Sequence, residues 1–244
     1  MKIFRFILSL IVIMSLCASG EMMAKTKKKV IAKKTVHHKR TKRRTVKHGL
    51  KVYRERRNLS VSPEPKGGKI KSSQGEPLFV VQKHDASHLH YDVRLEIGGV
   101  LVSWAVPKGP SVNPSIKRLA MPTDDHPMEY AHFEGNIPEG SYGAGSVMVW
   151  DLGIFENIKE EGGKLVPLKK CLALGTVEVF LKGKKLFGRF AFIKTQRGWL
   201  MIKMRDEFAN KWHCPANKRN KSVLTGRTQS QIAKEAKKTK KGKK

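Results

Sequence analysis

The stretch LHYDVRLEIGGVLVSWAV (residues 89–106) decides the expected fold. Apolar and polar residues alternate strictly over residues 89–97, and a period of two is typical of a β-strand with one apolar and one polar face. Gly98 and Gly99 follow at once, and both accept the positive φ angles of a two-residue hairpin turn. Residues 100–106 return as the partner strand, so this stretch predicts a β-hairpin.

Short strand-like segments recur along the rest of the chain. They cover residues 78–82, 147–150, 153–155, 175–180, 185–193 and 198–204. The two segments within residues 147–155 are expected to form another hairpin, and residues 111–145 are expected to form long loops rich in proline and glycine. Many short strands separated by turns predict an all-β, mainly antiparallel fold, a small closed β-barrel with long loops, over residues 58–213.

The basic residues are concentrated at the two ends of the chain. The 244 residues include 50 Lys and Arg against 20 Asp and Glu, a formal net charge of +30. Residues 25–57 hold 16 basic residues and one acid, and residues 217–244 hold 11 basic residues and one acid. Such segments cannot bury much apolar surface, so residues 21–57 and 214–244 are expected to be disordered basic arms. They suit salt-sensitive binding to the phosphates of a nucleic acid; solubilising tails or a loose contact with a membrane surface are the alternative.

The first residues have the pattern of a signal peptide. Lys2 and Arg5 precede an apolar run over residues 6–18, and small residues that suit cleavage follow. Residues 1–20 are therefore expected to be a leader, which would make the protein periplasmic or secreted. The run is too short to span a bilayer comfortably, so no stable membrane insertion is expected. Met23 offers an alternative start of translation, which would give a cytoplasmic protein.

Side chains that bind metals cluster on and beside the first strand of the hairpin. His90 and Asp92 share its polar face, and His84 precedes them by a short link that can bring it back to the same point. Two imidazoles and a carboxylate suit Mn²⁺, Fe²⁺ or Zn²⁺. Arg94, further along the same face, could hold an anion beside the metal, and Gln82 lies near. A polar strand face with mutually satisfied charges is the alternative.

A second polar cluster is the segment DDHPMEY around His126. His126 could donate a proton or bind a phosphate, with Tyr130 nearby, although a proline-containing loop without a chemical role is the alternative. His90, Asp92 and His126 also resemble the two-histidine, one-carboxylate triad of iron oxygenases. Those enzymes usually need a basic residue after the distal histidine. Residues 127–158 contain neither Lys nor Arg, which counts against an oxygenase.

Longer ordered motifs surround these clusters, and together they resemble the 3′-phosphoesterase domain of bacterial DNA ligase D and its stand-alone homologues. The matching stretches are QKHDASHLHYDVRLE (82–96), SWAVPKGP (103–110), DDHPMEYAHFEGNIPEGSYGAGSVMVWDLG (124–153), GTVEVFLKGKKLFGRFAFIK (175–194) and WLMIK (199–203). They cover most of residues 58–206 and are far more specific than a single His-x-Asp pair.

The resemblance implies a fold, a cofactor and an activity. It implies a small β-barrel whose interior polar groove holds a divalent metal, with Mn²⁺ favoured. It also implies trimming of DNA 3′ ends, by removal of a 3′-phosphate and by conversion of a terminal 3′-ribonucleotide to a clean 3′-OH that a polymerase or ligase can use.

The resemblance further implies roles for individual residues. The family's metal ligands match His84, His90 and Asp92. The groups that hold and activate the scissile phosphate match Arg94 and His126, supporting positions match Gln82 and Tyr130, and the family's upstream segment matches the further catalytic candidates Arg57 and Glu64. Asn58 stands where the family has an aspartate, and we expect this change to affect the ribonuclease step more than the phosphatase step.

The sequence therefore predicts a stand-alone, metal-dependent phosphoesterase that acts on DNA 3′ ends in repair by non-homologous end joining. DNA is the expected partner, and end-joining proteins such as Ku or a separate ligase are the expected protein partners. The alternative is a non-catalytic, basic nucleic-acid-binding protein with a vestigial barrel. The sequence indicates no oligomeric state.

Overall fold

The computed structural model describes residues 49–68, 75–211, 216 and 220–241. The expected leader and residues 21–48 of the expected N-terminal arm therefore lie outside the described residues, as do residues 242–244 at the other end. Among the helices in the described ranges, none combines the length and the apolar character that crossing a membrane requires.

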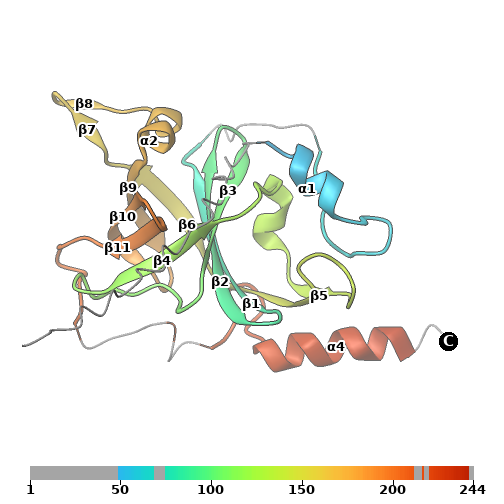
Figure 1. The fold of residues 1–244 in the computed structure, drawn as a ribbon. Helices are drawn as coiled ribbons and strands as arrows, with labels where there is room; N and C mark the ends of the chain where they lie inside the picture. Colours follow the sequence, from blue (N-terminus) through green and yellow to red (C-terminus); the bar gives the residue numbers. More distant parts are fainter. Residues whose placement is uncertain (1–48, 69–74, 212–215, 217–219, 242–244) are drawn as a thin grey trace, which may run out of the picture. The chain divides into compact units, whose positions relative to one another are not determined.

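Eight antiparallel strands close into a barrel (Figure 1). The sheet contains β1 (Leu78–Asp85), β2 (Leu89–Ile97), β3 (Val100–Val106), β4 (Lys117–Pro122), β5 (Gly135–Ile137), β6 (Gly145–Asn157), β9 (Thr176–Gly183), β10 (Phe187–Thr195) and β11 (Gly198–Lys203). Its order is β1-β2-β3-β4-β11-β10-β9-β6-β5, and a further pairing between β1 and β6 closes the ring, with β5 added beside β6. The predicted all-β antiparallel barrel is confirmed.

Several smaller elements lie outside the barrel. They are the helices α1 (Lys51–Arg56), α2 (Leu168–Leu174) and α4 (Gln229–Lys241), the 3₁₀ helix η1 (Met128–His132), and a small hairpin of β7 (Glu160–Glu161) and β8 (Lys164–Leu165). Of these, α1 and η1 matter most for the site, because they lie over the outer face of the β1–β2–β3 wall and add side chains to it.

The apolar faces of the strands fill the barrel. Tyr91, Val93 and Leu95 of β2 lie on one face of the strand. All three belong to a hydrophobic core cluster that contains residues from strands around the whole barrel. Within this cluster the ring centroids of Trp104 on β3 and Phe192 on β10 lie 4.9 Å apart. Burial of this surface provides the main driving force for closing the barrel.

The polar residues of β1 and β2 lie on the opposite, outer face of the barrel wall. Gln82, Asp92 and Arg94 are nonetheless buried, because the segment around α1, together with η1 and β5, covers this face. We call these elements the covering layer; Tyr53 and Tyr130 belong to the apolar cluster that it forms with the wall. The implied polar groove in the barrel interior is therefore wrong. The interior is mainly apolar, and Gln82, Asp92 and Arg94 lie between the wall and the covering layer.

Strand β6 corrects another prediction. The hairpin expected over residues 147–155 is wrong, because β6 is one continuous strand. Gly153 lies where β6 meets β9, paired with Gly183. A Cβ atom built on Gly153 would lie 2.2 Å from the carbonyl oxygen of Lys182. This glycine therefore allows a close approach of two strands and does not form a turn.

Both basic arms are partly folded where the structure describes them. The disorder predicted for residues 214–244 is wrong for residues 220–241, because Ile232 of α4 is only 2% exposed and the backbone N–H of Val223 donates to the carbonyl of Val149 at 3.0 Å. The N-terminal arm also ends earlier than predicted, since Tyr53 of α1 is fully buried. An apolar side chain in each segment finds a place on the barrel, and tertiary packing then stabilises the helix around it.

Candidate active site

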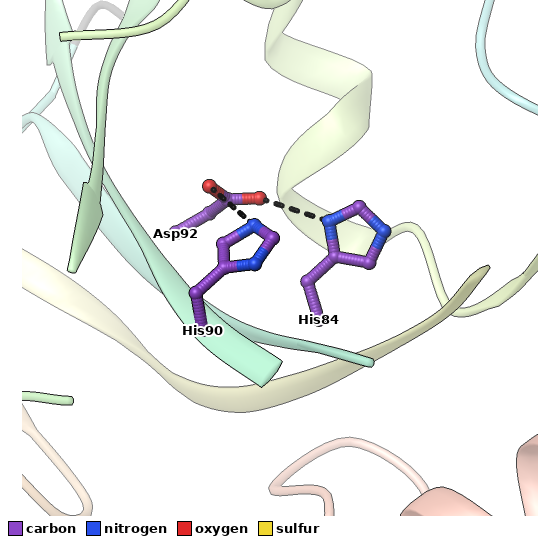
Figure 2. Close-up of side chains that lie close together, drawn as sticks. All are labelled: His84, His90 and Asp92. Atoms are coloured by element: carbon purple, nitrogen blue, oxygen red, sulfur yellow. Dashed lines mark ion pairs between the residues drawn. The ribbon is translucent and has the colours of Figure 1, made fainter. Parts of the chain in front are cut away.

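The β1–β2 hairpin brings the three predicted metal ligands together (Figure 2). His84 pairs with His90 across the ladder, and Gln82 pairs with Asp92, so all four side chains share one face. The ligand atoms of His84, His90 and Asp92 lie within 4.8 Å of one another. His84 Nδ1 is 3.5 Å from Asp92 Oδ2, and His90 Nε2 is 3.6 Å from Asp92 Oδ1.

Hydrogen bonds behind the two imidazoles determine which nitrogen faces the carboxylate. His84 Nε2 lies 3.0 Å from the carbonyl oxygen of Gly143, and His90 Nδ1 lies 2.8 Å from that of His88. A carbonyl oxygen only accepts, so these nitrogens carry the protons in the neutral rings. The lone pairs of the other two nitrogens then face the carboxylate of Asp92, which also only accepts.

This arrangement fits a divalent cation. Three acceptors that converge without a shared proton repel one another, and a cation between them reverses the sign of that interaction. Each ring donates its other N–H to a backbone carbonyl, which fixes the orientation of the ring. Metal-bound histidines commonly have such a hydrogen bond. His84 and Asp92 are buried, whereas the side chain of His90 is 22% exposed, so the cluster reaches solvent on the side of His90.

Arg94 holds Asp92 in its charged form. The guanidinium Nη2 of Arg94 donates to Asp92 Oδ2 at 2.9 Å. Burial alone would raise the pKa of Asp92, but the charge of Arg94 outweighs burial and holds this pKa below its usual value. Asp92 is therefore ionised at neutral pH, as a carboxylate that binds a metal must be.

Arg94 is in turn fixed by three other side chains. Its Nε donates to Gln82 Oε1 at 2.8 Å, and its Nη1 donates to Ser103 Oγ at 2.9 Å. The same Nη1 lies 2.8 Å from His126 Nδ1. The amide nitrogen of Gln82 donates to the carbonyl of Tyr130 at 2.9 Å, which ties η1 to the barrel wall. Arg94 therefore links the barrel wall to the covering layer.

His126 lies between two guanidinium groups. Besides the contact with Arg94, its Nε2 is 3.0 Å from Arg57 Nη2, and its Nδ1 is 2.8 Å from the carbonyl oxygen of Asp124. Burial, followed by the charges of Arg94 and Arg57, lowers the pKa of His126 well below its usual value. The ring is therefore neutral at pH 7 in a strongly positive environment.

A buried ion pair of the covering layer adjoins His126. Arg57 Nε donates to Glu64 Oε1 at 3.0 Å, and the two side chains are 6% and 1% exposed. The hydroxyl of Tyr130 donates to the same oxygen at 3.0 Å, and the hydroxyl of Ser62 donates to Glu64 Oε2 at 2.7 Å. Burial and the Glu64 carboxylate raise the pKa of Tyr130 well above its usual value, so its phenol stays protonated.

The structure thus gathers all the residues predicted for the site into two adjoining groups. The metal group contains His84, His90 and Asp92. The second group, which we call the His126 group, contains His126, Arg57, Glu64, Tyr130 and Gln82. Arg94 joins it to the metal group through its contacts with Asp92 and His126. Their chemical roles remain predictions.

Asn58, which stands where the resembled family has an aspartate, is exposed and bonded within its own loop. Its side-chain oxygen accepts the backbone N–H of Ser60 at 3.3 Å, and its backbone carbonyl accepts that of Ser62 at 3.0 Å. Asn58 therefore caps the turn that carries the chain from Arg57 to Glu64.

Three residues that were not predicted complete the site. They are Ser103, Asp124 and Gly143. Ser103 had a signal in the sequence, because the two-residue turn at Gly98–Gly99 places it opposite Arg94. Asp124 and Gly143 lie in loops, whose position the sequence does not predict. Only Gly143 carries a local signal, because its φ of +77° is a conformation that favours glycine.

The chain is similar to known proteins over the residues that form the metal group. A family model described as the DNA ligase D 3′-phosphoesterase domain matches residues 82–194. The chain is 45% identical over 163 residues to the multifunctional non-homologous end joining protein LigD of Pseudomonas aeruginosa. The aligned residues make up 64% of this chain and 19% of that protein.

Two further relatives show the same pattern. The identity is 42% over 159 residues with LigD of Mycolicibacterium smegmatis, covering 65% of this chain and 21% of that protein. With LigD of Mycobacterium tuberculosis it is 43% over 160 residues, covering 65% and 20%. The chain spans about a fifth of the length of the curated relatives it matches. The resemblance seen in the sequence motifs is confirmed.

Proposed function

We propose, from the match of residues 82–194 to the DNA ligase D 3′-phosphoesterase domain, that this protein is a metal-dependent phosphoesterase that acts on the 3′ ends of DNA. It removes a 3′-phosphate and trims a terminal 3′-ribonucleotide, which leaves a 3′-OH end for a polymerase or ligase. The observation that supports this proposal best is the convergence of His84, His90 and Asp92 beside Arg94.

His84, His90 and Asp92 would hold the divalent ion, and Mn²⁺ is our proposed ion. When bound, such an ion polarises a phosphoryl oxygen and lowers the pKa of a water molecule. Arg94 contributes to this group by keeping Asp92 ionised and in place, so we assign it both a positioning role and a charge that faces the phosphate.

The arginines on both sides of His126 supply the positive charge that a phosphate needs. Arg57 and Arg94 approach opposite ring nitrogens of His126, at 3.0 and 2.8 Å. A phosphate oxygen beside this ring would meet guanidinium N–H donors, which bind phosphate strongly. Glu64 and Tyr130 hold Arg57 in its orientation, and we assign them supporting roles.

His126 would respond to the substrate by a change in its proton affinity. Burial and the two guanidinium charges keep the ring neutral, and a phosphate dianion would offset the guanidinium charges, so the imidazolium becomes easier to form. In hydrolysis of the 3′-phosphate, the oxygen of a water molecule bonds to phosphorus and the bond between phosphorus and O3′ breaks. The leaving O3′ takes up a proton, which we propose that the protonated form of His126 supplies. The attacking water gives up one proton to solvent, from which His126 is protonated again, and inorganic phosphate is released.

The basic segments would hold the DNA backbone close to the site without reading sequence. The names of the relatives place those proteins in non-homologous end joining, so we propose Ku or a separate ligase as protein partners. We also propose that the leader is used, in which case the enzyme would act on extracellular or imported DNA. A chain that starts at Met23 would instead act inside the cell.

The test is an end-processing assay with the full-length protein. A labelled primer that carries a 3′-phosphate or a 3′-ribonucleotide is annealed to a template and incubated with and without Mn²⁺. His90→Ala and Asp92→Ala should each lower the rate by at least about 100-fold. His88→Ala is the matched control, because the exposed side chain of His88 is replaced while its carbonyl stays.

Two results would overturn the proposal. Undiminished turnover in both variants would refute the metal group, and salt-sensitive DNA binding without any metal-dependent turnover in the wild type would favour the non-catalytic alternative.

A further inference from the structure

Tyr142 is a half-exposed aromatic residue at the edge of the site. It is 47% exposed and lies in the loop between β5 and β6. The next residue is Gly143, whose carbonyl oxygen lies 3.0 Å from Nε2 of His84. Tyr142 is therefore one residue from the group that orients a ligand of the metal group.

Two arginines hold the ring of Tyr142 against the His126 group. The guanidinium carbon of Arg56 lies 5.3 Å from the ring centroid, and that of Arg57 lies 5.2 Å from it. Arg56 Nη1 also lies 3.1 Å from the tyrosine hydroxyl and 2.9 Å from Asp124 Oδ1. Since Arg57 also contacts His126, the ring is linked to both groups of the site while about half of its surface faces solvent.

An exposed, held aromatic ring is a suitable surface for a nucleobase. Bases stack on aromatic side chains whatever their sequence, because every base has a π-face. The neighbouring guanidinium groups add cation–π attraction for the base, and their positive charge favours the approach of a negatively charged strand. In a strand that ends in a 3′-phosphate, the terminal base and the phosphate are attached to the same sugar, so a phosphate beside Arg57 and His126 brings the terminal base to this edge of the site.

We propose that Tyr142 is a stacking platform for the terminal nucleobase of the DNA strand that the enzyme processes. This inference rests on the proposed function, since it takes the 3′ end as the substrate. The ring positions the terminal nucleoside without reading its identity, so Tyr142 is a positioning residue. If the ring served only to pack against Arg56 and Arg57, its loss would be felt equally by every substrate, with or without a base.

The kinetic test uses two strands that both end in a 3′-phosphate. One has an ordinary terminal nucleotide, and the other has an abasic residue at that position. On the ordinary strand Tyr142→Ala should raise KM roughly tenfold with little change in kcat, the equivalent of ~1.4 kcal/mol of stacking. On the abasic strand Tyr142→Ala and the wild type should be alike, and Tyr142→Phe should behave as the wild type on both.

Phe187→Ala is the control, because Phe187 is an exposed aromatic residue of similar exposure (41%) on β10. It should show no loss that depends on the terminal base. An equal loss of kcat/KM on the ordinary and abasic strands by Tyr142→Ala would overturn the stacking role, since the ring would then act only on the protein.

A binding measurement separates this inference from the proposed function. A strand with 2-aminopurine at its 3′-terminal position is bound to the metal-free, full-length protein, where no turnover is needed. Stacking on Tyr142 should quench the fluorescence in the wild type and in Tyr142→Phe but much less in Tyr142→Ala. Tyrosine-dependent quenching without turnover would leave the stacking role intact and defeat the phosphoesterase; turnover with quenching that does not depend on Tyr142 would do the reverse.

Discussion

His84 Nδ1 lies 3.5 Å from Asp92 Oδ2, although neither atom carries a proton in the neutral tautomer that the Gly143 carbonyl selects. Two acceptors at this distance repel each other until a cation or a proton enters between them. The folded protein therefore has a preformed site whose acceptors become favourable only when it is loaded, and metal binding should stabilise the fold.

Metal addition should raise the thermal stability of the wild type but not of a variant without the carboxylate. At a Mn²⁺ concentration of about 100 times the dissociation constant, the free energy of unfolding should increase by about 2.7 kcal/mol. In Asp92→Asn the same addition should leave the melting temperature where it was without metal. The melting temperatures are measured by differential scanning fluorimetry. An equal rise in both proteins would mean that the ion binds elsewhere.

The buried pair of Arg57 and Glu64 should contribute far more to stability than an exposed pair in the same segment. Glu64→Gln leaves the Arg57 guanidinium without its main counter-charge and should cost about 3 kcal/mol, the low end for a broken buried pair. Asp124, at 3.7 Å from Arg57, limits the loss. Glu55→Gln, which breaks an exposed pair with Lys51, should cost less than about 0.5 kcal/mol. Urea unfolding measures both, and similar small losses would contradict the burial argument.

Asp151 should make the stability of the barrel depend on pH. Its buried carboxylate accepts the backbone N–H groups of Lys184, Lys185 and Leu186 at 3.0, 3.1 and 2.8 Å. Burial nevertheless raises the pKa of Asp151 to about 6. Because the folded-state pKa lies above the unfolded value, the stabilising contribution is fully present below about pH 4 and is lost as the pH rises through about 6.

The measurement is the free energy of unfolding of the wild type and of Asp151→Asn between pH 4 and pH 7. The stability of the wild type relative to the variant should fall over this range, by up to about 3 kcal/mol. A difference that stays flat or grows with pH would show that Asp151 does not titrate in this way.

Neutralising the lysines of α4 should weaken DNA binding and its salt dependence together. These lysines are Lys234, Lys237, Lys238, Lys240 and Lys241. Replacing them with glutamine should lower the slope of log K against log salt by about 0.9 for each phosphate of duplex DNA that the variant no longer neutralises. Lysine-to-arginine replacements at the same positions keep the charge and should keep the slope. An unchanged slope in the glutamine variant, measured by fluorescence anisotropy, would exclude α4 from the interface.

The hairpin of residues 89–106 shows how far the local sequence determines the site. Strict alternation and the two-glycine turn predict both strands and their register, and so the common face of His90, Asp92 and Arg94. The burial of that face was not predictable, because the covering layer comes from loops whose position depends on distant contacts. One such contact is the hydrogen bond from the Gln82 amide to the Tyr130 carbonyl.

The hairpin predicted over residues 147–155 and the disorder predicted for the C-terminal tail are wrong for related reasons. Gly153 and the residues around it have the composition of a turn, but tertiary pairing with β1 and β9 holds them in one strand. The basic tail has the composition of a disordered segment, but one buried residue, Ile232, together with the hydrogen bond from Gln229 to Ser146 Oγ at 2.9 Å, holds α4 on the barrel. Local composition contains no information on such long-range partners.

The most direct test of the metal group is the count of Mn²⁺ ions bound to each chain, measured by electron paramagnetic resonance during titration of the metal-free protein. The wild type and His88→Ala should each bind one ion tightly, whereas His84→Ala, His90→Ala and Asp92→Ala should each lose it, together with 3′-phosphate release. Tight binding that survives in all three variants would contradict the assignment of the ion to these residues.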